Sequence, residues 1–124
     1  MNLINAANNV ITTLSSQSYE LARTRAELET QRPNFVDDSG VLKGIFGNVS
    51  RQLILALEHF EDIIQLGKQT IGLKEARIIM HSANEAARNL AEAKYDLIRA
   101  LSDDQSEAYL QANIETINNS IISF

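Results

Sequence analysis

The chain has two histidines, His59 and His81, and each is followed closely by a carboxylate. Glu85 comes four residues after His81 and Asp62 three residues after His59, spacings that place both members of a pair on one helix face. Such a pair could supply two metal ligands, but a structural or catalytic site needs at least a third from elsewhere. Carboxylate di-iron bundles carry Glu-x-x-His on two helices, and neither histidine here has that spacing. We therefore expect solvated side chains and no metal site.

Other catalytic arrangements are missing from the sequence. Without cysteine, disulfides and thiolate metal sites are excluded. No H-E-x-x-H, G-x-S-x-G or glycine-rich phosphate loop occurs. Glu58, Glu61 and Asp62 form an acidic cluster, which is more typical of a hydrated helix face than of an acid–base pair. We expect a protein that is not an enzyme, with no catalytic residue and no cofactor.

Length and charge narrow the class of protein further. A chain of 124 residues is most typical of one domain, here residues 1–124. The net charge of −5 argues against nucleic acid as a partner, because phosphate binding needs clustered Lys and Arg. No apolar run approaches the roughly 20 residues of a membrane span. The N-terminal residues do not resemble a secretory signal, so we expect a cytoplasmic protein, with export by a route without a cleaved signal as the alternative.

The spacing of apolar residues predicts the elements that position these side chains. Residues recur at intervals of three and four, as in the heptads of a coiled coil, over about 2–31, 40–66, 73–101 and 104–123. Four long helices joined by short connections predict an all-α, up-down-up-down antiparallel bundle. The same patterns would also permit packing between subunits. The second helix should end at Gly67, in the left-handed conformation.

Two of these helices show the clearest seams of apolar residues. Alternation of alanine with larger residues in the third helix should let neighbouring helix axes approach closely. The first-helix seam contains Leu3, Ala7, Val10, Leu14, Gln17, Leu21, Thr24 and Leu28, and the third-helix seam contains Ile79, Ala83, Ala86, Leu90, Ala93, Leu97 and Ala100.

Residues 32–48 span the connection between the first two helices and the first turns of the second, and they are unusually apolar for such a segment. Pro33 should end the first helix before it, because a residue preceding proline is disfavoured in the α region. Two interpretations remain open for the large side chains of this segment. They either close the open end of the bundle or bind a partner protein: Phe35, Val36, Ile45 and Phe46.

The second helix carries more apolar residues than one seam requires. In its sequence LILAL at residues 53–57, Ile54 and Leu57 lie outside the seam, and Ile64 follows. The second-helix seam contains Leu42, Phe46, Val49, Leu53, Ala56, Phe60 and Ile63. A helix that is apolar on more than one face either has a wide core face or is covered by another chain. We expect self-association through this helix, most simply as a dimer.

Two classes of function are consistent with these features. The first is a small acidic module for protein–protein interaction, such as an adaptor, chaperone, immunity or inhibitor protein, whose partner is another protein. The alternative is a structural subunit of a helical filament, coat or secretion assembly. Sedimentation distinguishes them, because a module forms small discrete species and a filament grows without limit.

Overall fold

A computed structural model describes residues 2–31, 41–101 and 107–121. These residues form four helices and no strand: α1 (Leu3–Gln31), α2 (Val41–Leu66), α3 (Leu73–Leu101) and α4 (Glu107–Ser120). The predicted all-α bundle is therefore confirmed. The predicted bounds of the first three helices agree to within one residue, whereas the fourth helix is shorter within the described range.

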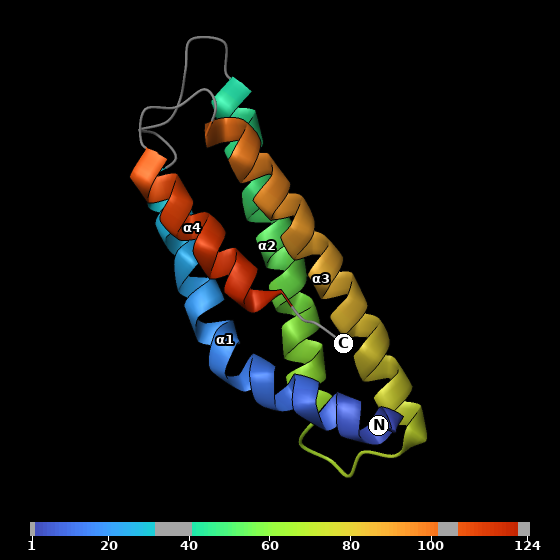
Figure 1. Cartoon of the computed structure of the whole chain (residues 1–124). Coiled ribbons are helices and arrows are strands. Elements are labelled where there is room, and N and C mark those ends of the chain that lie inside the picture. The colour runs from blue at the N-terminus through green and yellow to red at the C-terminus, as the bar shows by residue number, and fades with distance from the viewer. Residues whose placement is uncertain (1, 32–40, 102–106, 122–124) are drawn as a thin grey trace.

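The helices form an elongated bundle in which the chain reverses direction from each helix to the next (Figure 1). α2 and α3 make the most extensive contact, α1 packs against all three other helices, and α4 packs against α1 and α3. In the described part of the chain no Cα atom of α2 lies within 8 Å of one in α4, so these two helices lie diagonally opposite each other. This packing is compatible with the predicted up-down-up-down order.

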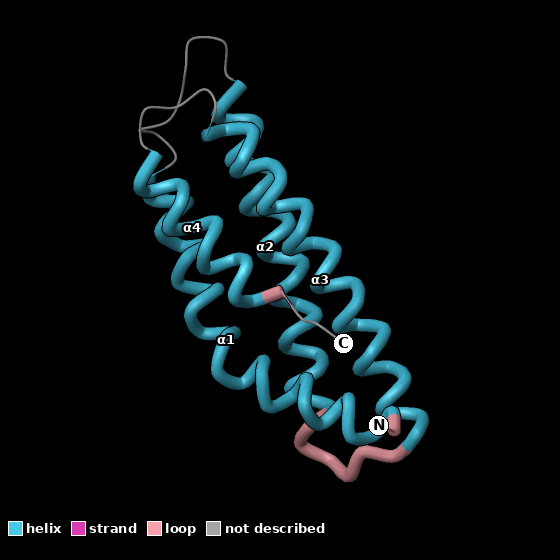
Figure 2. Tube along the Cα trace, in the orientation of Figure 1, coloured by secondary structure: helices cyan, strands magenta, loops and turns pink. Residues whose placement is uncertain are grey.

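α4 covers only part of the bundle, and α1 bends to cover another part (Figure 2). The N-terminal half of α1 crosses the ends of α2 and α3 that are furthest from α4. Within the N-terminal half of α1, the hydroxyls of Thr12 and Ser15 donate to the carbonyls of Asn8 and Ile11 at 3.1 and 2.9 Å. Hydroxyls that bond to the preceding turn often bend helices, which gives a local reason for the shape of α1.

The predicted seams face the core. Every seam residue of α3 has no exposed surface, and the seam of α1 is buried except for Leu3 and Gln17, which are half-buried. Gln17 uses its side-chain amide to donate to the backbone carbonyl of Asn119 in α4. Thr24 is buried among the apolar residues. The spacing of apolar residues therefore identified the buried faces of these two helices.

At the N-terminal ends of two helices, side-chain oxygens accept hydrogen bonds from backbone N–H groups. Asn2 caps α1, because its Oδ1 accepts a hydrogen bond of 2.8 Å from the Asn5 N–H. At the start of α3, Glu75 Oε1 accepts from the Gly72 N–H at 2.9 Å, which is one half of a capping box.

α2 ends beside Gly67 as predicted, but the predicted reason for a glycine at this position was wrong. Its backbone does not adopt the left-handed conformation, and its N–H still donates to the Ile63 carbonyl at 2.9 Å. The Ile11 side chain lies against it instead, so an added Cβ would be 2.9 Å from Ile11 Cγ2. Glycine at this position lets the bent half of α1 approach the end of α2.

Gly44 and Gly47 lie inside α2, and among the described residues no neighbouring atom comes within 4 Å of an added Cβ. Gly44→Ala and Gly47→Ala should each raise the free energy of unfolding by about 0.5–1 kcal/mol, because alanine loses less backbone entropy in a helix. Gly67→Ala is the matched control and should lower it. Urea denaturation at low protein concentration measures all three; a loss of stability at position 44 or 47 would contradict the prediction.

Candidate functional site: a groove between α1 and α2

The histidines and carboxylates do not form a metal centre within the described ranges. His59 is half-buried on α2 and His81 is exposed on α3. Among residues 2–31, 41–101 and 107–121, no group of three or more His, Cys, Asp or Glu side chains could hold a metal ion. No described helix is long and apolar enough to cross a membrane.

The candidate residues near the start of α2 separate into two groups. Phe35 and Val36 lie outside the described residues. Ile45 and Phe46 are buried in the core, with Phe46 only 2% exposed. A side chain enclosed in this way has no surface to offer a partner, so the position of Ile45 and Phe46 favours the alternative that they close the bundle.

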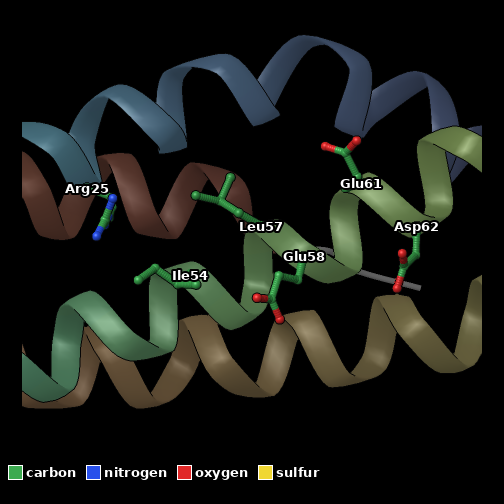
Figure 3. Close-up of a pocket in the computed structure, with 6 residues that line it drawn as sticks. All are labelled: Arg25, Ile54, Leu57, Glu58, Glu61 and Asp62. Carbon is green, nitrogen blue, oxygen red and sulfur yellow. The ribbon is translucent and has the colours of Figure 1, made fainter.

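The extra apolar residues of α2 lie at or near the surface. Ile54 is 36% exposed, and Leu57 and Ile64 are half-buried. Ile54 and Leu57 line an open groove of about 450 Å³ between α1 and α2 (Figure 3). Ile64 is not part of its lining. The structure therefore brings two of the three candidates into one concave surface.

Charged side chains line the two ends of the groove, with basic and acidic residues at opposite ends along the direction of α2. Arg25 extends from α1 near the N-terminal end of the groove, where its Nε donates to Ser50 Oγ at 3.3 Å (Figure 3). Glu58, Glu61 and Asp62 lie towards the other end, beyond Leu57. All three acidic residues are exposed. The groove thus has an apolar middle, one basic end and one acidic end.

The outer surface of α2 continues this pattern. Leu55 is 37% exposed beside Ile54. Arg51 is exposed one turn before them, and its Nη2 donates to Asn48 Oδ1 at 2.7 Å. Sequence reasoning missed Arg25 and Arg51 as parts of this surface. The seven-residue spacing from Arg51 to Glu58, which places both on one face, was the available signal.

A second hollow of about 320 Å³ lies between α2 and α3, lined in part by Asn48, Asp96 and Arg99. Asp96 is only 3% exposed. One of its oxygens accepts from the Asn48 side-chain amide, and the other accepts from Arg99 Nη1 at 3.1 Å. This buried carboxylate is already bonded, so the network joins α2 to α3 and offers no unpaired group to a ligand.

Comparison with protein-family models, with curated proteins and with solved structures found no match to this chain.

Proposed function

We propose that the chain is a non-enzymatic protein–protein interaction module that binds another protein through the groove between α1 and α2. The observation that carries the proposal is the presence of Ile54 and Leu57 in an open groove with charged ends. Apolar side chains surrounded by polar groups are typical of the centre and rim of a protein interface.

The shape of the site favours a helix as the bound element. The groove runs along two helices, and its apolar residues are three apart on α2. A partner helix placed along it would present its own residues at intervals of three and four to this surface. The charged ends would then orient the partner, because opposite charges across an interface favour one direction of docking.

Site-specific cross-linking tests the proposal. A photo-reactive amino acid at position 54 should form a covalent adduct with one discrete protein in cells of the native source. Tyr95 on α3 is the matched control position, because it is 61% exposed and lies away from the groove. Mass spectrometry of the linked peptides identifies the protein and the contacted segment.

A second variant shows whether the adduct depends on the groove. Leu57→Glu should reduce the adduct at position 54 roughly tenfold or more, because an interface anchor contributes at least about 1–2 kcal/mol. An adduct with a second copy or with another protein supports the proposal. No adduct at position 54, or the same adducts at positions 54 and 95, would overturn it.

A further inference from the structure

We infer that the partner helix is α2 of a second copy of this chain, packed antiparallel about a two-fold axis near Ile54 and Leu55. This inference rests on the proposed function, because it names the occupant of the groove and extends the contact to the adjoining outer face of α2. A two-fold interface uses one patch on both subunits, so the patch must be complementary to itself. The α2 face meets this condition in its charges and in its apolar centre.

The charges are arranged on opposite sides of the proposed axis. Arg51 and Arg25 lie on the N-terminal side of Ile54, with Arg25 held at the level of Ser50. Glu58, Glu61 and Asp62 lie on the C-terminal side. Rotation about the axis places the basic side of each copy against the acidic side of the other. A parallel arrangement would instead bring like charges together, which costs several kcal/mol.

The register follows from one pair of residues. Arg51 and Glu58 are seven residues apart, and the midpoint between them falls between Ile54 and Leu55. Arg51 of one copy therefore faces Glu58 of the other, and the pair occurs twice. Within the described part of its own chain, Glu58 makes no ion pair. Its charge is available to a second molecule.

The centre of the face is apolar. Ile54 and Leu55 are 36% and 37% exposed, and they lie side by side in the sequence at the axis. Contact between two copies would cover Ile54 and Leu55 of each copy. Removal of this apolar surface from water favours association, and the charge pairs select the direction.

The glycines of α2 give the second copy room to approach. Gly44 and Gly47 share the outer face with Arg51, since their spacings of three and four repeat along one side of the helix. No described residue of their own chain lies within 4 Å of an added Cβ, so no contact among the described residues requires glycine at these positions. In the antiparallel register Gly47 faces Asp62 of the second copy, where a larger side chain would hold the helices apart.

Analytical ultracentrifugation of the purified chain tests the inference. The wild-type chain should sediment as a dimer that dissociates on dilution. Arg51→Glu and Glu58→Arg should each raise the dimer dissociation constant about tenfold or more, since each brings like charges together twice. An equal mixture of the two variants should recover the dimer, because both contacts are then complementary. The combined variant R51E/E58R should recover it within one chain.

Matched controls separate this effect from changes in folding or net charge. Arg77→Glu changes an exposed arginine on α3 by the same charge and should leave the dimer constant within about twofold of wild type. Circular dichroism should show unchanged helicity in every variant, because Arg51 and Glu58 are exposed.

Several results would overturn the inference. A dimer that both single variants leave intact would place the interface elsewhere, and a mixture that stays monomeric would contradict the antiparallel register. Growth beyond a dimer would contradict a closed two-fold interface. A wild-type monomer at every concentration, combined with a position-54 adduct to a different protein, would overturn the dimer while the proposed function stands.

Discussion

Phe46→Ala should lower the free energy of unfolding by about 3–5 kcal/mol. The side chain is 2% exposed and belongs to the core at the start of α2. Removing its ring loses the burial of that apolar surface and leaves a cavity that the surrounding helices fill only in part. Urea denaturation followed by circular dichroism measures the change.

Tyr19→Ala is the matched control for Phe46→Ala, because Tyr19 is an aromatic residue that is 78% exposed. Its substitution should change stability by no more than about 0.5 kcal/mol. The pair of results decides between the two roles considered for Phe46. Unchanged stability with loss of the position-54 adduct would make Phe46 a partner contact and would contradict its assignment to the core.

Ala86→Leu and Ala93→Leu should each lower the free energy of unfolding by about 1–3 kcal/mol. Neither alanine has any exposed surface in the seam of α3. Because protein interiors are close-packed, the added isopropyl group must displace neighbouring side chains or separate the helices. Thermal and urea denaturation at one fixed protein concentration measure the effect.

Ala91→Leu controls for the change of residue type, because Ala91 is exposed on the same helix. Its effect should lie within about 0.5 kcal/mol of zero. If Ala86→Leu and Ala93→Leu unfolded at the same temperature and urea concentration as the control, the seam of α3 would have room for larger side chains and the prediction would be wrong.

The sequence by itself determined the four helices and the buried faces of α1 and α3. A spacing of three and four places Leu14 and Leu21, or Leu90 and Leu97, on one side of a helix whatever else surrounds it. Burying that side from water is the main source of stability for such helices, so a sustained pattern is sufficient to identify it. The bounds of α3 follow from the same pattern, with Gly72 before it.

Only the tertiary structure decided which residues of different helices meet. The pattern on α2 does not specify that Arg25 of α1 lies at one end of the groove and Glu61 near the other, because this depends on how far each helix is shifted along its neighbour. Ile11 against Gly67 likewise depends on the bend of α1. Periodicity records the direction of a side chain around its own axis, whereas a site between helices is set by their offset, bending and crossing.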